Sequence, residues 1–281
     1  AGVLWMRQGH IMEGPKPKQL LAAACIGLLM LSLTTNSQST NDYLTSYLIE
    51  FFQSEQGQRD IVSRLNIPSD RQDIYLDHIS DLFGNSAMIE ELADNMQTLI
   101  DDASLSELDA LKPVFAEVGF GLAEQAVIEG MQKLPPNEMR RLLYYDIDAM
   151  QTLPPDVCVD LVNNELTASE QTNVGIGYQN QLSRESLREY LALTRRAIHA
   201  HYSRSSTGRS ISPSQEKIAS DTYLQRMLDH PHSEILIEIL ASPDRYTDAE
   251  NCWALSEVSL IAVEEPGIIG DWLMIWLINQ Y

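Results

Sequence analysis

Basic residues are scarce in this chain of 281 residues: Lys and Arg total 19 against 40 Asp and Glu, which gives a net charge of -21. A surface this acidic repels phosphate backbones, so the composition excludes a general nucleic-acid-binding role. It favours solubility and a basic partner, although charge alone does not define an activity. The hydrophobic fraction of 44% is ordinary for a globular protein and argues against a disordered chain.

Strand patterns are also missing. No stretch alternates apolar and polar residues between turn residues, whereas apolar residues recur at helical spacing along nearly the whole chain. The sequence therefore predicts an all-α protein, an irregular multi-helix bundle of about nine to eleven helices that follows an N-terminal signal or anchor segment.

Several helix starts can be predicted from local sequence. A capping box, in which two side chains satisfy each other's free backbone N–H groups, occurs at Ser104–Glu107, Thr167–Glu170, Ser212–Gln215 and Thr247–Glu250. Two Leu-Pro-Pro segments begin at Leu134 and Leu153, and Pro is favoured at the first helical position. The sequence also predicts that Ser86 is the N-cap of a helix and that the glycine-containing stretch Val174–Asn180 forms a loop.

Long apolar runs are few, and the one near the start of the chain sets the expected compartment. Leu20–Leu33 follows Lys16 and Lys18 and precedes a polar run, which is the order of an export signal. It is shorter than the roughly 20 residues that a membrane span needs. We therefore predict a leader over residues 1–37 and a periplasmic or secreted protein. If the leader is not cleaved, residues 20–33 anchor the protein in the inner membrane, facing the periplasm.

Glycine, proline and serine cluster at one interior place. The stretch Ser203–Pro213 is rich in serine and contains both Gly and Pro, which is typical of a linker. It predicts an N-terminal helical lobe over residues 38–203, a linker over 204–213 and a C-terminal helical lobe over 214–281.

Cysteine is rare, with three in the chain. Cys25 lies in the predicted leader, which leaves Cys158 and Cys252 as an even pair in an oxidising compartment. The sequence favours a disulfide between them. Two buried free thiols, or a thiol with a chemical role, are the alternatives.

One segment departs from the acidic composition. Six arginines and two glutamates lie between residues 184 and 209, a local charge of +4. Three interpretations are open. The segment is an anion-binding or acidic-partner surface, a basic helix packed on acidic neighbours, or an exposed linker that is cut by a protease. The six are Arg184, Arg188, Arg195, Arg196, Arg204 and Arg209.

The weak candidates for a metal site are the histidine clusters His199, His201, His230 and His232. Residues two apart on a helix point in different directions, so His199 and His201 are not expected to share a metal. A stripe of Asp73, Asp77 and Asp81 beside His78 is the other titratable cluster, suited to acid–base work or to a solvated helix face.

No catalytic motif, cofactor motif or metal-ligand spacing emerges. We therefore expect an exported, acidic, helical protein of the cell envelope that acts without catalysis, through contact with a protein partner. An envelope hydrolase or metal-dependent enzyme using the four histidines is one alternative. A carrier of an apolar ligand near Trp253 and Trp272 is the other.

Overall fold

The computed structural model confirms the all-α prediction. Its described residues are helical or lie in turns and connections, and none of them forms a strand. No helix within this described part of the chain has the length and apolar character needed to cross a membrane. The predicted leader lies outside the described residues, which are 50, 53–65, 67–91, 94, 125–163, 165–203 and 208–279.

The chain divides into two compact units, each of which combines separate stretches of sequence. Unit 1 holds the described residues of 131–165 and 206–281, and unit 2 holds those of 21–130 and 166–205. Residues 131–165 therefore group with the C-terminal part of the chain. The predicted lobes 38–203 and 214–281 stay a prediction about which parts fold independently.

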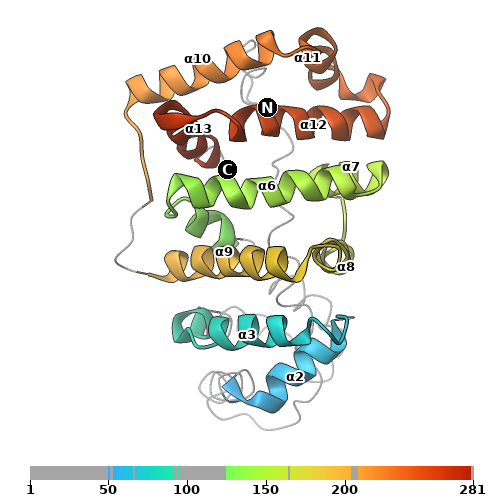
Figure 1. Ribbon diagram of the computed structural model, residues 1–281, viewed down its shortest axis with the longest axis vertical. Helices are drawn as coiled ribbons and strands as arrows, with labels where there is room; N and C mark the ends of the chain where they lie inside the picture. The colour runs from blue at the N-terminus through green and yellow to red at the C-terminus, as the bar shows by residue number, and fades with distance from the viewer. Residues whose placement is uncertain are drawn as a thin grey trace. The chain divides into compact units, whose positions relative to one another are not determined.

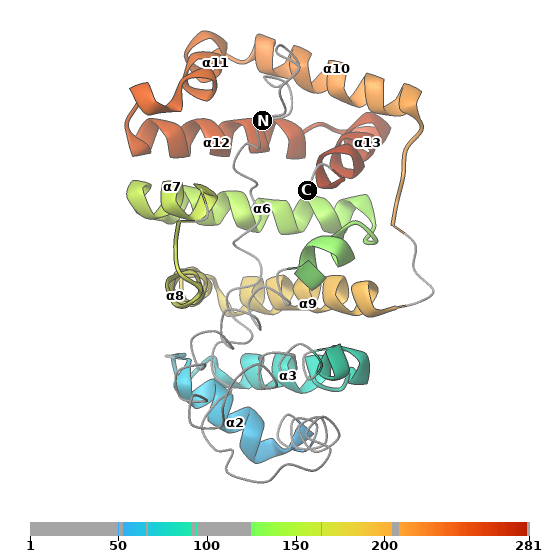
Figure 2. The ribbon, with the colours of Figure 1, turned by 180° about the vertical axis from the view of Figure 1, so that it is seen from behind.

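Unit 1 is built from three layers of helices (Figures 1 and 2). The α12–α13 pair lies in the middle, with α10 and α11 on one side and α6 and α7 on the other. The helices are α6 (Pro136–Thr152), α7 (Pro155–Asn163), α10 (Pro213–Asp229), α11 (Ser233–Ala241), α12 (Asp248–Val263) and α13 (Gly267–Ile278), with a short 3₁₀ helix η3 (Pro243–Arg245) before α12.

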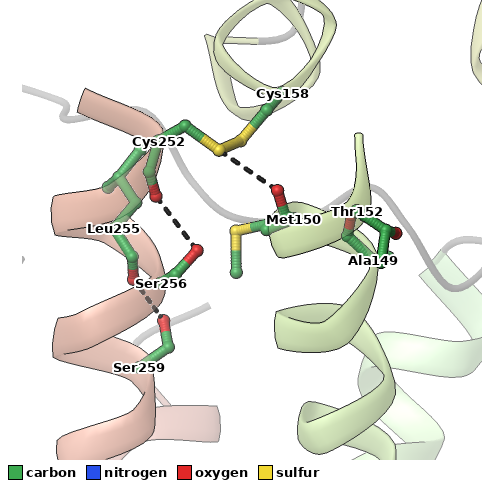
Figure 3. Close-up of a disulfide and its surroundings, with 8 residues drawn as sticks. All are labelled: Ala149, Met150, Thr152, Cys158, Cys252, Leu255, Ser256 and Ser259. Carbon is green, nitrogen blue, oxygen red and sulfur yellow. Dashed lines mark hydrogen bonds between the residues drawn. A yellow bond between two sulfur atoms is a disulfide. The ribbon is translucent and has the colours of Figure 1, made fainter. Parts of the chain in front are cut away.

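The composition of α12 and α13 explains why they occupy the middle layer. Both are apolar around most of their circumference, which is typical of a helix covered on more than one side. The serines of α12 fit this setting because their hydroxyls donate to backbone carbonyls four residues earlier. Ser256 bonds Cys252 at 3.0 Å and Ser259 bonds Leu255 at 2.9 Å, as Figure 3 shows.

The predicted helix starts are found where the structure describes them. Capping boxes open α10 at Ser212 and α12 at Thr247, with both reciprocal hydrogen bonds present. Pro136 and Pro155 stand at the first positions of α6 and α7. Ser104–Glu107 lies outside the described residues. Local capping chemistry therefore fixes where these helices begin.

A buried glutamate ties the three layers of unit 1 together. Glu265, in the connection between α12 and α13, accepts a 2.7 Å hydrogen bond from Arg226 of α10, and its side chain is only 9% exposed. From the other side, Arg140 of α6 donates to the Glu265 backbone carbonyl at 3.2 Å. The backbone there is tightly packed, since a Cβ on Gly270 would lie 1.8 Å from that carbonyl oxygen.

A disulfide joins the outer α6–α7 layer to the middle layer. The Sγ atoms of Cys158 in α7 and Cys252 in α12 lie at bonding distance, 1.96 Å, with Cα atoms 6.0 Å apart (Figure 3). The structure thus brings together the pair predicted from the sequence. Because unit 2 takes its residues 166–205 from the chain between these cysteines, the bond connects two stretches of unit 1 that are far apart in sequence.

Unit 2 contains α2 (Glu55–Arg64), α3 (Gln72–Leu82), α8 (Ala168–Gln179) and α9 (Arg184–Tyr202), with shorter helical stretches at 86–91 and 125–130. α3 packs against both α2 and α9. α9 also meets the 125–130 stretch at close range, because a Cβ on Gly130 would lie 1.7 Å from the carbonyl oxygen of Ala197. Only glycine allows that approach.

Two local predictions in unit 2 were wrong. Val174–Asn180 is not a loop, since α8 continues to Gln179. Its end is buried and bonded: Tyr75 Oη donates to Gln179 Oε1 at 2.7 Å, and this tertiary burial outweighs the low helix propensity of glycine. The cap of the 86–91 stretch is Asn85 rather than Ser86, because Asn85 Oδ1 accepts from the N–H of Ala87.

Replacing Glu265 with Ala should destabilise unit 1, because Arg226 loses its buried partner across two layers. We expect the midpoint of thermal unfolding to fall by about 2–6 °C. Glu264→Ala is the matched control, since Glu264 is the exposed neighbour, and should change the midpoint by less than about 1 °C. Equal effects of the two substitutions, measured by circular dichroism, would show that Glu265 does not join the layers.

Replacing both cysteines by Ala should lower the free energy of unfolding by about 4–5 kcal/mol on the chain-entropy model for a loop of this length. The loop is long because the cysteines are 94 positions apart. Denaturant unfolding with and without a reductant measures the effect. A reductant should lower the free energy of unfolding of the wild-type protein and leave that of the Cys158→Ala/Cys252→Ala protein unchanged. Similar values for both proteins, with and without reductant, would contradict the expectation.

Candidate functional site: the seam between α3 and α9

The arginines of α9 face the aspartates of α3. Arg184 donates to Asp73 Oδ2 at 2.6 Å, and Arg188, one turn further along α9, lies 3.5 Å from the same oxygen. Burial acts to raise the pKa of Asp73, but the hydrogen bond and charge of Arg184 outweigh it, so the pKa lies below its ordinary value. The basic segment on α9 and the aspartate stripe on α3 therefore pair with each other.

The same pattern continues toward the end of α3. Arg195 lies 3.6 Å from the carboxylate of Asp81 and donates to the backbone carbonyl of Asp77 at 3.3 Å. We call the contact from Asp73 to Asp81 on α3, with Arg184 to His199 on α9, the α3–α9 seam. In the seam the arginines meet acidic residues of the same chain. This arrangement agrees with the interpretation of the basic segment as a helix packed on acidic neighbours.

The remaining arginines have different surroundings. Arg196 is exposed on α9, and Arg204 lies outside the described residues. Arg209 belongs to unit 1, where its Nε donates to the carbonyl of Leu134 at 2.6 Å and its backbone N–H donates to the carbonyl of Gln132 at 2.9 Å. The described end of the predicted linker is thus bonded to the start of the α6–α7 layer. The anion or partner surface stays a prediction.

His199 sits at the end of the seam with both ring nitrogens engaged. Nε2 lies 3.0 Å from Asp81 Oδ2, and Nδ1 lies 3.3 Å from the side-chain amide nitrogen of Asn85. The amide nitrogen can only donate, so Nδ1 accepts and Nε2–H donates to the carboxylate. In this arrangement the imidazole presents neither nitrogen to a substrate or a metal.

An open pocket of about 680 Å³ lies over this part of unit 2. Its polar groups contact one another, because Asp81 bonds both Arg195 and His199. The polar groups of the pocket therefore pair with one another across the two helices, and they do not point together at a ligand. Its lining residues are Asp77, Ser80, Asp81, Gly84, Asn85, Arg195 and His199.

His78, which the sequence placed beside the aspartate stripe, is inside the seam. Its side chain is 2% exposed, and burial, followed by the positive charge of Arg195, lowers its pKa to about 3. The ring is neutral at pH 7. A buried neutral imidazole packs in the core, whereas the carboxylates of Asp73 and Asp81 pair with arginine at the exposed edge of the seam.

The structure separates the four candidate metal-binding histidines. On α9, His199 bonds Asp81 while His201 Nδ1 lies 3.2 Å from Glu129, so the two rings face different partners, as their spacing predicts. In unit 1, His230 Nε2 lies 3.3 Å from Glu257 and its Nδ1 accepts from the backbone N–H of His232. Among the described residues, no three or more His, Cys, Asp or Glu side chains are placed to hold a metal ion.

Tryptophans near the proposed apolar-ligand region contact aromatic neighbours in unit 1. The Trp276 ring lies 6.0 Å from that of Tyr223, and the Trp253 ring lies 6.0 Å from that of His232. Tyr223 also donates to the backbone carbonyl of Val258 at 3.1 Å. These contacts assign Trp276 and Tyr223 to the packing between α10, α12 and α13.

Sequence reasoning missed Glu265. Its only sequence signal was a Glu-Glu-Pro turn, which is equally typical of solvent-exposed chain. Comparison with known proteins adds no identity: no protein-family model, curated protein or solved structure matches this chain.

Asp73→Asn should weaken the seam at neutral pH and not in acid. The lowered pKa means that Asp73 stabilises the fold while charged, and that this contribution is lost as the pH falls through the pKa of the folded state. At pH 7 we expect the melting midpoint to drop by up to about 3 °C, since both partners are partly exposed. The difference from wild type should decrease as the pH falls below the ordinary Asp pKa of 3.8 and through the lowered pKa of Asp73 in the folded state.

Asp70→Asn provides the control, because Asp70 is an exposed residue three positions earlier. Melting curves from pH 2 to 8 should overlay wild type for this variant. A pH-independent loss in Asp73→Asn, or an equal loss in Asp70→Asn, would contradict the role of the Asp73–Arg184 pair.

Proposed function

We propose that the protein is a non-enzymatic binding protein of an oxidising compartment outside the cytoplasm, and that it contacts a basic protein partner through α10. The observation that carries this proposal is a pair of exposed leucines, one helical turn apart, on the outer helix α10 of unit 1, with exposed carboxylates nearby in α10 and α11. The disulfide supports the compartment, and the charge of the chain supports the kind of partner.

The chemistry of the cysteines supports the proposed compartment. Disulfides persist in secreted and periplasmic proteins and are rare in reducing cytosol. Cys158 is fully buried and Cys252 is 7% exposed, so the bond has the burial of a structural disulfide. An export signal at residues 1–37, predicted from the sequence, agrees with this setting.

The outer face of α10 supports the choice of partner surface. Leu224 and Leu228 are 38% and 51% exposed. The neighbouring basic residues are already engaged, since Lys217 pairs with Asp221 and Arg226 with Glu265. Exposed carboxylates flank the leucines along α10 and α11, namely Glu216, Asp221, Asp229, Glu234 and Glu238. Such a face fits a protein segment that carries apolar side chains between Lys or Arg residues.

The two alternatives stay predictions with different requirements. An envelope hydrolase or metal enzyme needs the histidines released from their carboxylate and backbone partners. A carrier needs an apolar cavity beside Trp253 and Trp272. The contacts described above favour neither.

Position-specific photo-cross-linking in the exporting host tests the proposal. A benzophenone side chain at position 224 or 228 should yield the same adduct, and one at the exposed position Glu185 of unit 2 should not. The adduct's protein is then purified and its affinity measured. Leu224→Ser/Leu228→Ser should weaken binding at least about tenfold, as expected for central apolar contacts.

Two matched variants separate surface contact from general effects. Tyr144→Ser removes an exposed side chain from α6, on the other side of the middle layer, and should leave the affinity unchanged. Glu216→Gln/Glu234→Gln should weaken binding and reduce its dependence on salt. The proposal fails if the adducts do not depend on position, or if the leucine variant binds the purified protein as tightly as wild type.

A further inference from the structure

The two sulfurs of the disulfide have different polar surroundings. Cys252 Sγ lies 3.2 Å from the backbone carbonyl oxygen of Met150, the contact drawn as a dashed line in Figure 3. A disulfide sulfur carries no hydrogen, so in the oxidised protein this is a contact rather than a donated hydrogen bond. A Cys252 thiol, in contrast, can donate to this oxygen. Cys158 Sγ has no polar partner among the described residues and is fully buried.

The carbonyl of Met150 is available because of its place in α6. Met150 is the third residue from the end of α6, and Pro154, four positions further on, has no backbone N–H to donate to its carbonyl. The Cys252 thiol would therefore satisfy an acceptor at the end of α6. Reduction leaves a polar link between α6 and α12 at the point where the disulfide had connected α7 and α12.

α6 and α7 are held to the middle layer to different degrees. α6 buries five side chains, contacts both α12 and α13, and places Arg140 against Glu265 and Asp271. α7 is nine residues long, packs on α12, and buries only Cys158, Leu161 and Val162. The covalent bond is made by α7 itself and so holds α7 directly, whereas noncovalent contacts hold α6.

We propose that the disulfide is a structural clamp on α7: when a dithiol reduces the bond, α7 is released from α12 while the α6–α12 contact and the rest of unit 1 stay folded. The dithiol supplies two electrons and two protons and becomes a disulfide. The Cys158–Cys252 bond breaks and both cysteines become thiols. The Cys252 thiol donates to Met150, and the Cys158 thiol has no such acceptor. The clamp does not depend on a partner protein.

Hydrogen exchange with mass spectrometry on the full chain, oxidised or reduced with dithiothreitol, tests the release. Intact mass after acid quench reports the thiol state. Amides of residues 155–163 should exchange at least about tenfold faster after reduction, and those of 136–150 should change by less than about threefold. Equal acceleration of both segments means global loosening, and no acceleration means that packing alone holds α7; either result overturns the proposal.

A pair of variants with identical composition tests the role of Met150 without a reductant. Cys158→Ala/Cys252→Ser keeps a hydroxyl donor opposite the Met150 carbonyl, and Cys158→Ser/Cys252→Ala moves the hydroxyl to α7. Both serines can also bond the carbonyl four residues earlier in their own helix, so only the contact between helices differs. The first variant should have a folding equilibrium constant about three- to tenfold larger. Equal constants, or the opposite order, would contradict the asymmetry.

Discussion

The bond between Cys158 and Cys252 is the covalent constraint of unit 1, because it joins α7 to α12 across 94 positions of sequence. Its helices come from two stretches of chain, 131–165 and 206–281, with residues of unit 2 in between. Bringing such stretches together costs chain entropy, which a cross-link removes from the unfolded state. Packing then supplies the rest: an apolar middle layer is covered on both sides, and Glu265 receives arginines from the outer layers.

Charge pairing has the corresponding role in unit 2. The basic residues of α9 and the acidic stripe of α3 would each repel themselves, yet together they place Arg184 on Asp73 and Arg195 on Asp81. Beneath them His78 stays neutral because it is buried. Partly exposed pairs contribute little stability individually, so their main effect is to fix which residues of the two helices meet. A binding surface is therefore better sought where the carboxylates and apolar side chains face solvent, as on α10.

Local chemistry determined what could be predicted from the sequence. Capping boxes and prolines give the starts of α6, α7, α10 and α12, because the atoms involved lie within a few residues. The same reasoning failed at Gly175 and Gly177, where burial of α8 outweighs propensity. The meeting of α3 with α9 joins residues over a hundred positions apart, and no periodicity encodes it. The sequence showed both charge clusters but not that they are partners, and the proposed partner surface required the exposure of each side chain on α10.

The most direct test of this account is the thiol state of the protein exported by its own type of host. Intact mass is measured after alkylation under denaturing conditions, with and without prior reduction. The account predicts that Cys158 and Cys252 are alkylated only after reduction, and that a fragment pair cut between them separates only in reductant. Alkylation of both cysteines without reduction would show that the exported protein lacks the bond and would remove the main support for an oxidising compartment.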